Sequence, residues 1–213
     1  AMNLSMNHLY KLPLRVSNLI NVWNNFFIKG KPKNAVKICD MWIRQQPESI
    51  FPYRMKAEIF QHQGMAKEAI LAINDLLERH PDYYSAYRNL RATYLRLGDY
   101  ENALKYAEIY LDKYPNEGKS YENLAHVYEK MGEFSNAKDY YEQALMLEST
   151  NIYYMLAIAD VDFSLGNFQE SKDQLDEALS MCKSNQDFSQ SYQSFSQYYS
   201  WTGEIKKSIT SYE

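Results

Sequence analysis

The sequence has few cysteines and no long apolar run, and each shortage excludes a class of protein. Its 213 residues include only two cysteines, Cys39 and Cys182, too few for a disulfide framework or a cysteine-rich zinc site. No apolar run approaches the roughly 20 residues that cross a bilayer. The formal net charge of −4 gives no electrostatic preference for nucleic acid or an anionic membrane. We therefore expect neither nucleic acid nor a membrane as partner.

Targeting signals are also missing from the first residues. Residues 1–7 lack the basic stretch and the apolar core of a secretory signal. Few cysteines fit a reducing compartment, so we expect a cytoplasmic location.

Glycine is scarce, with seven copies, and its spacing indicates the architecture. Five glycines stand 34 residues apart, and the next follows after 37: Gly30, Gly64, Gly98, Gly132, Gly166 and Gly203. Three prolines, Pro47, Pro81 and Pro115, share the period of 34. A fixed period of this length is typical of stacked supersecondary units.

One unit shows what is repeated. Apolar and aromatic residues between 84 and 96 have helical spacing, and Gly98 can end that helix in the left-handed conformation. A second amphipathic stretch contains Ala103 and Ala107 and stops at Pro115. Each unit is therefore predicted to be a helical hairpin with two apolar faces. Because one hairpin cannot bury both faces, neighbouring hairpins must stack into a solenoid.

The repeat resembles the tetratricopeptide repeat, a resemblance that covers most of the chain. Residues 118–151 carry the family pattern most closely, with Tyr121, Leu124, Ala125, Tyr128, Gly132, Ala137, Tyr141 and Ala144. The resemblance implies an all-α, right-handed superhelical α-solenoid of about six repeats, the last incomplete. We place an N-terminal extension or cap at 1–15 and the array at 16–213, with units 16–49, 50–83, 84–117, 118–151, 152–188 and 189–213.

Several positions depart from the family pattern. Trp23 and Arg91 stand where the pattern has a small residue, and Asp162 stands where it has an aromatic ring. Ala137 keeps the small residue at the helix crossing, where overpacking costs about 1–3 kcal/mol. The spacing of 37 predicts three extra residues, which we place in a longer loop at Lys183–Gln186. The sequence ends midway through an expected helix, which suggests a fragment or a further helix in a longer protein.

No residue pattern indicates catalysis, a cofactor or a metal. The four histidines (His8, His62, His80, His126) form no i, i+4 pair that could present two metal ligands on one helical face. Asp160 and Asp162 lie two apart on an expected helix, so they do not face each other. The glycines are too widely spaced for a phosphate-binding loop. We predict that the chain is not an enzyme.

The family resemblance implies a concave groove lined by the first helix of each hairpin. Mapped onto the middle units, the groove positions are Arg54, Glu58, His62, Arg88, Asn89, Arg96, Lys119, Glu122, Asn123, His126, Glu129 and Lys130. Five of these side chains are basic and three are acidic. In an acidic chain, this excess predicts an acidic or carboxylate-bearing peptide ligand. A mixed, solvated surface with no ligand is the competing interpretation.

One subclass of the family clamps the C-terminal carboxylate of chaperone tails. The corresponding positions here are Arg54, Glu58, Asn89, Lys119 and Asn123. Glu58 would repel a carboxylate, and Asn123 also departs from that pattern, so the sequence argues against this ligand.

Aromatic and apolar residues at the groove ends are candidate binding anchors. They are Phe27, Ile28 and Phe51 at one end, and Tyr153, Phe163 and Trp201 near the other. They could instead pack against neighbouring domains, or Trp201 could mediate self-association. We therefore predict a protein-interaction scaffold, with a regulatory or docking region of a larger enzyme as the alternative.

Overall fold

A computed structural model describes residues 12–204, and this part of the chain contains helices and no strand. The helices fall into two compact units, residues 1–99 and residues 100–213. The first unit contains α2 (Leu14–Trp23), the π-helix η2 (Asn24–Ile28), α3 (Pro32–Gln45), α4 (Ile50–His62), α5 (Ala66–Arg79) and α6 (Ser85–Leu97). The second contains α7 (Tyr100–Lys113), α8 (Gly118–Met131), α9 (Phe134–Leu147), α10 (Ile152–Leu165), α11 (Phe168–Met181) and α12 (Asn185–Trp201).

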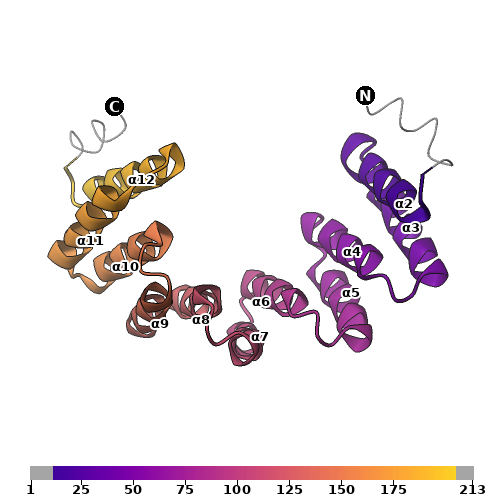
Figure 1. Cartoon of the computed structure of the whole chain (residues 1–213), viewed down its shortest axis with the longest axis horizontal. Helices are drawn as coiled ribbons and strands as arrows, with labels where there is room; N and C mark the ends of the chain where they lie inside the picture. Colours follow the sequence, from indigo (N-terminus) through magenta and orange to yellow (C-terminus); the bar gives the residue numbers. More distant parts are fainter. Residues whose placement is uncertain (1–11, 205–213) are drawn as a thin grey trace. The chain divides into compact units, whose positions relative to one another are not determined.

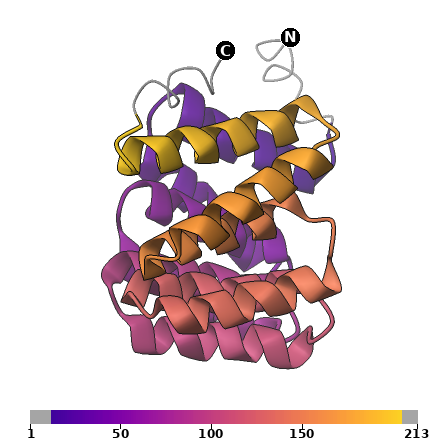
Figure 2. The same ribbon diagram turned by 90° about the vertical axis from the view of Figure 1, so that its left-hand side faces the viewer.

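Within each unit, helices that follow one another along the chain pack as neighbours (Figure 1). Figure 2, which looks onto the second unit, shows α11 and α12 as successive layers. The predicted all-helical α-solenoid is confirmed. The first part of the predicted extension and the predicted end of the last repeat lie outside the described residues.

The periodic glycines end the first helix of each hairpin, as predicted. All six have a positive φ, between 59° and 85°, whereas no other residue type does within residues 12–204. Gly98 shows the reason: with φ at 72°, its N–H bonds to the Leu95 carbonyl and the following N–H to that of Tyr94. A side chain would be strained in this conformation, so the chain turns where glycine recurs.

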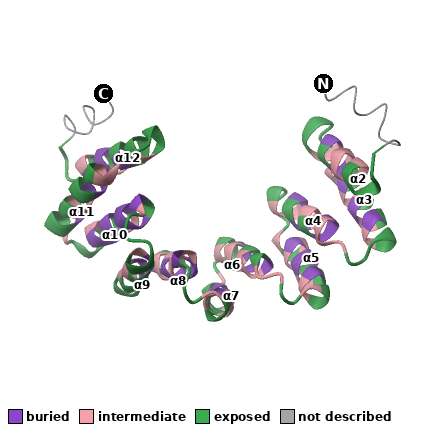
Figure 3. Cartoon of the chain, viewed as in Figure 1, coloured by how far each residue is buried: buried purple, intermediate pink, exposed green. Residues whose placement is uncertain are grey.

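Small residues lie at the helix crossings. Ala69, Ala103 and Ala137 have no exposed surface, which confirms that they are packing positions. Buried residues lie on the faces that helices turn toward their neighbours (Figure 3). Helix α10 packs against α9, α11 and α12, and eight of its residues are buried. The core of the second unit is therefore centred on α10.

The first hairpin corrects one prediction. Trp23, expected at a small packing position, is 48% exposed, while Val22 and Asn24 are buried. The chain changes from α-helix to π-helix at Asn24, and the wider turn holds an extra residue. This extra residue rotates the large indole out of the helix crossing.

The three extra residues before Gly203 also lie elsewhere than expected. Helix α11 ends at Met181, and α12 begins already at Asn185, with Ser184 and Asp187 forming a capping box. Helix α12 has 17 residues, whereas α10 has 14. The predicted longer loop is wrong: three residues are close to one helical turn, so they lengthen the helix without changing which face packs.

Candidate functional site

Residues predicted to line the groove of the first unit form one recess. Arg54, Glu58 and His62 on α4 and Asn89 on α6 line it, with Ala57 and Gln61 completing its wall. Its volume is about 360 Å³. We call it the α4–α6 recess. Two helices from successive repeats thus bring together four of the predicted site residues.

Hydrogen bonds hold the two walls of the α4–α6 recess in register. Gln61 Nε2 on α4 donates to Thr93 Oγ1 on α6 at 3.0 Å, and the Thr93 hydroxyl donates to the Asn89 carbonyl at 2.7 Å. Thr93 is fully buried. Because the link is buried, it fixes the spacing between the helices that carry the recess.

The charged residues at the mouth of this recess are open to solvent. Glu58 Oε1 lies 4.0 Å from His62 Nε2, and about half of each side chain is exposed. The Arg54 guanidinium carbon lies 5.9 Å from the centre of the Phe51 ring. Arg88 and Arg96, also predicted as groove residues, lie on α6 but do not line the recess.

An aromatic ridge adjoins the α4–α6 recess. It consists of Trp23, Phe26 and Phe27, whose neighbouring ring centroids lie 4.3 Å and 4.6 Å apart. The Phe27 ring is 6.1 Å from the His62 ring, which itself lines the recess. Trp23 and Phe27 are each 48% exposed. Sequence reasoning named Phe27 as a candidate anchor but noted Trp23 only as a departure at a small packing position, because the π-helical turn leaves no signal in the spacing of apolar residues.

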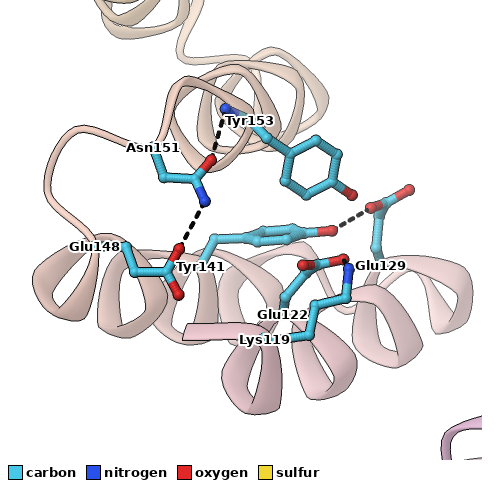
Figure 4. Close-up of polar contacts among 7 residues, drawn as sticks. All are labelled: Lys119, Glu122, Glu129, Tyr141, Glu148, Asn151 and Tyr153. Atoms are coloured by element: carbon cyan, nitrogen blue, oxygen red, sulfur yellow. Dashed lines mark hydrogen bonds and ion pairs between the residues drawn. The ribbon is translucent and has the colours of Figure 1, made fainter. Parts of the chain in front are cut away.

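In the second unit, the predicted basic residues are paired with acids. Lys119 Nζ lies 2.5 Å from Glu122 Oε1, and Lys130 Nζ lies 3.3 Å from Glu129 Oε1 (Figure 4 shows the first pair). Asn123 is buried, with 1% of its surface exposed, so this predicted groove residue offers little surface to a ligand. The excess positive charge predicted for the groove is therefore largely neutralised in this unit.

A second recess lies between the first helices of three repeats in the second unit. His126 and Glu129 come from α8, Tyr153 and Asp160 from α10, and Gln190 and Gln193 from α12. The volume is about 340 Å³. We call it the α8–α12 recess. Its lining follows the predicted groove positions, which could have identified Asp160 had they been extended to residues 152–188.

Two aromatic rings and two carboxylates give this recess its chemistry. Tyr141 is buried, and its hydroxyl donates to Glu129 Oε2 at 3.0 Å. Figure 4 shows the Tyr153 ring beside that of Tyr141, with both hydroxyls directed toward Glu129. Burial, and then the charge of Glu129, raise the pKa of the Tyr141 phenol well above its ordinary value. Sequence reasoning treated Tyr141 only as a core residue.

Asp160, in the lining of the α8–α12 recess, has a carboxyl group with a raised pKa. Burial and the charge of Glu129 raise the pKa of its carboxyl to about 6. The Asp160 side chain is exposed to solvent where it lines the recess. Within residues 12–204, its carboxylate has no hydrogen-bond or ion-pair partner.

The family assignment follows from comparison with known proteins. A tetratricopeptide-repeat family model matches residues 118–151, and a second tetratricopeptide-repeat model matches residues 54–118. Residues 54–151 of this chain therefore carry tetratricopeptide repeats. No curated protein sequence gives a significant match. Tetratricopeptide arrays are protein-interaction scaffolds and are generally non-catalytic, and this chain has their fold.

Solved tetratricopeptide-repeat structures superpose on much of this array. A tetratricopeptide repeat protein from Parabacteroides merdae matches with a TM-score of 0.74 and 13% identity, over 99% of this chain and 81% of its own. PilF from Pseudomonas aeruginosa matches with a TM-score of 0.64 and 16% identity, over 99% and 90%. MamA from Desulfovibrio magneticus matches with a TM-score of 0.62 and 17% identity, over 76% and 91%. At these identities the likeness concerns the fold.

The formal charge of this tetratricopeptide array is distributed unevenly between its units. Residues 1–99 contain 14 basic and 8 acidic side chains, for a net charge of +6. Residues 100–213 contain 9 basic and 19 acidic side chains, for a net charge of −10. The overall charge of −4 conceals this difference, so the two units differ in the ligands that they attract.

An aromatic surface also surrounds the end of α12. Phe163 and Trp201, predicted as anchors, have ring centroids 4.7 Å apart. Together with Phe134 and Phe168 they line a depression of about 960 Å³. Phe168 and Trp201 are each about half exposed.

Residues 12–204 contain neither a cluster of potential metal ligands nor a helix suited to crossing a bilayer. No group of three or more His, Cys, Asp or Glu side chains in this range could hold a metal ion. No helix in the same range is both long and apolar enough to cross a membrane.

Proposed function

We propose that the array binds a peptide segment of a partner protein in its concave surface, and that the α4–α6 recess receives an acidic part of that segment. The observation that carries this proposal is the convergence of Arg54, Glu58, His62 and Asn89, from two repeats, on one recess beside an exposed aromatic ridge. Exposed aromatic and arginine side chains are the residues most often found at binding hot spots.

Charge supports an acidic ligand at this recess. The first unit carries a net charge of +6, which attracts an acidic segment over several ångströms. Arg54 can bond a carboxylate with two parallel N–H groups, and Asn89 can donate one further hydrogen bond. Glu58 disfavours a carboxylate beside it, so we expect side-chain carboxylates near Arg54 rather than a chain terminus held by the whole clamp.

The aromatic ridge supplies the apolar part of the proposed contact. Trp23 and Phe27 together present two half-exposed rings next to the recess. A partner segment with an apolar residue close to its acidic residues would bury these rings. We therefore propose a ligand that combines acidic and large apolar side chains.

The experiment measures binding of a fluorescein-labelled nonapeptide of alternating Glu and Leu by fluorescence anisotropy. Arg54→Glu is expected to weaken binding about tenfold or more, because it replaces an attraction by a repulsion. Lys67→Glu is the matched control, since Lys67 is exposed on α5 outside the recess. Equal losses in the two variants would show that only the overall charge matters, and would overturn the proposal.

We also propose that the array acts without catalysis of its own and that it functions in the cytoplasm. The scarcity of cysteine supports the second point. Location of a tagged full-length protein in its native cell tests it directly, and a secreted or membrane-bound protein would contradict it.

A further inference from the structure

We infer that the α8–α12 recess binds an arginine or lysine side chain of a partner segment, the opposite charge preference to that of the first unit. This inference rests on the proposed function, because it takes the concave surface to be the binding surface. It concerns only residues of the second unit. The partner chemistry is a basic peptide in an extended conformation, with one cationic side chain inserted between α8, α10 and α12.

The geometry of the recess suits a long cationic side chain. Three helices enclose the α8–α12 recess. Its volume of about 340 Å³ is similar to the 360 Å³ of the α4–α6 recess, but the residues that line the two recesses differ. The α8–α12 recess contains no lysine or arginine in its lining. Glu129 and Asp160 supply carboxylate acceptors, and Gln190 and Gln193 on α12 supply further amide acceptors.

Aromatic rings complete the site. Tyr153 lines the recess and is 45% exposed, whereas Tyr141 is buried. Guanidinium and ammonium groups are attracted to the faces of aromatic rings, and arginine stacks on them well. The Lys119 ammonium already lies 5.9 Å from the centre of the Tyr153 ring, which shows that a cation can approach this ring.

The state of the two carboxylates favours a cation beside Asp160. Glu129 is held by Lys130 and by the Tyr141 hydroxyl, so its position is fixed. Asp160 has no corresponding partner within residues 12–204 and faces the charge of Glu129. An acid that has no base of its own and lies beside a second acid lowers stability, and such arrangements are characteristic of functional sites.

The contrast with Asp162, two residues further on, supports this interpretation. Asp162 is buried and bonded to Lys138 Nζ at 2.6 Å and to Asn167 Nδ2 at 3.0 Å. The fold therefore neutralises the buried acid, Asp162, and leaves Asp160, in the lining of the α8–α12 recess, without a base. The net charge of −10 on the second unit adds a longer-range attraction for a basic segment.

Binding should depend on pH through Asp160. Because the pKa of its carboxyl is raised to about 6, the charged form that attracts a cation increases between pH 5 and pH 7. Affinity for a basic peptide is therefore expected to rise over this range. The other titratable groups facing Asp160 are His126 and Glu129 on α8, Tyr141 on α9 and Tyr153 on α10, while α12 contributes only neutral side chains.

The test uses the full chain and a fluorescein-labelled nonapeptide of alternating Ala and Arg. Asp160→Asn is expected to weaken binding about tenfold at pH 7.5 and to remove most of the increase in affinity between pH 5 and pH 7. Asp139→Asn is the matched control, because it removes the same charge from an exposed position on α9. It is expected to change affinity less than twofold. Equal effects of the two variants would overturn the inference.

A second variant and a second peptide distinguish failure of this inference from failure of the proposed function. Glu129→Gln is also expected to weaken the Ala–Arg peptide, since it removes the other carboxylate of the recess. The Glu–Leu peptide used for the α4–α6 recess should bind Asp160→Asn as well as it binds the unchanged protein. If that acidic peptide binds and the basic one does not, the inference fails and the proposed function stands. If neither peptide binds, both fail.

Sedimentation of the free protein tests a second copy as the occupant. We expect the sedimentation coefficient to be the same for the unchanged protein and for Asp160→Asn at each concentration. A self-associated protein that dissociates on Asp160→Asn would show that the basic unit of another copy occupies the recess, and would overturn the assignment to a partner peptide.

Discussion

Lys138 Nζ on α9 lies 2.6 Å from Asp162 Oδ1 on α10, and this ion pair occupies the position where neighbouring repeats carry an aromatic ring. The Asp162 side chain is 2% exposed and that of Lys138 is 26% exposed. The hydrogen bond to Asp162 raises the pKa of the Lys138 ammonium above its ordinary value, and the charges of the neighbouring carboxylates add to this effect. The pair links the fourth and fifth predicted repeats.

Removing the base from this pair should destabilise the second unit. Lys138→Met keeps a long, unbranched side chain but leaves the buried Asp162 carboxylate bonded only to Asn167. A buried carboxylate that loses its base typically costs about 3 kcal/mol in the free energy of unfolding. Urea denaturation, followed by circular dichroism, measures the change.

The matched control for this prediction is Lys172→Met. Lys172 Nζ lies at the same distance, 2.6 Å, from Asp176, but the Asp176 side chain is 53% exposed. An exposed pair of this kind contributes about 0.5 kcal/mol. Similar losses of stability in the two variants would show that burial of Asp162 does not determine the cost.

Enlarging a helix-crossing residue should also destabilise the array. Ala137 has no exposed surface and packs against Ala125, Tyr141, Ile158 and Val161. Ala137→Leu has no space for its three additional carbon atoms, so we expect a loss of about 1–3 kcal/mol. Ser135→Leu, at an exposed position on the same helix, should change stability by less than about 0.5 kcal/mol. An unchanged melting temperature for Ala137→Leu would contradict the predicted packing.

The two cysteines should differ in reactivity. Cys39 is fully buried, and burial raises the pKa of its thiol to about 12, so almost no thiolate forms at pH 8. Cys182 is partly exposed. A chromogenic disulfide reagent at pH 8 should therefore modify one thiol rapidly in the folded protein and both in urea. Cys182→Ser should abolish the rapid phase, and rapid modification of that variant would show that the first hairpin opens readily.

Much of the fold could be predicted because the turns that end its helices depend on single residues. Each positive-φ turn requires glycine at one position, so the spacing of Gly64, Gly98 and Gly132 specifies the hairpins directly. The π-helix at Asn24 and the longer α12 could not be predicted in the same way. In both cases the extra residues lie inside a helix. The spacing of apolar residues in the sequence does not distinguish such a longer helix from a longer loop.

The sequence predicts groove positions but not the charge that they present. Arg54 and His126, both at predicted groove positions, line the two recesses. Counting formal charges did not reveal that Lys119 pairs with Glu122, because pairing depends on side-chain conformations in three dimensions. Nor could it show that Asp160 faces Glu129 across two helices, since these residues are 31 positions apart in the sequence.

The unpartnered acid of the α8–α12 recess should lower the stability of the protein at neutral pH. The pKa of Asp160 is raised from 3.8 to about 6 in the folded state, so folding favours its protonated form. The resulting stabilisation is fully present below pH 3.8 and is lost as the pH rises through about 6. Asp160→Asn should therefore be more stable than the unchanged protein at pH 7.5, by about 1 kcal/mol once solvent screening of this exposed side chain is included. At pH 4 the difference should nearly vanish. Thermal unfolding at both pH values measures it, with Asp139→Asn as the control, and a variant that is less stable at pH 7.5 would show that the Asp160 carboxylate stabilises the fold instead.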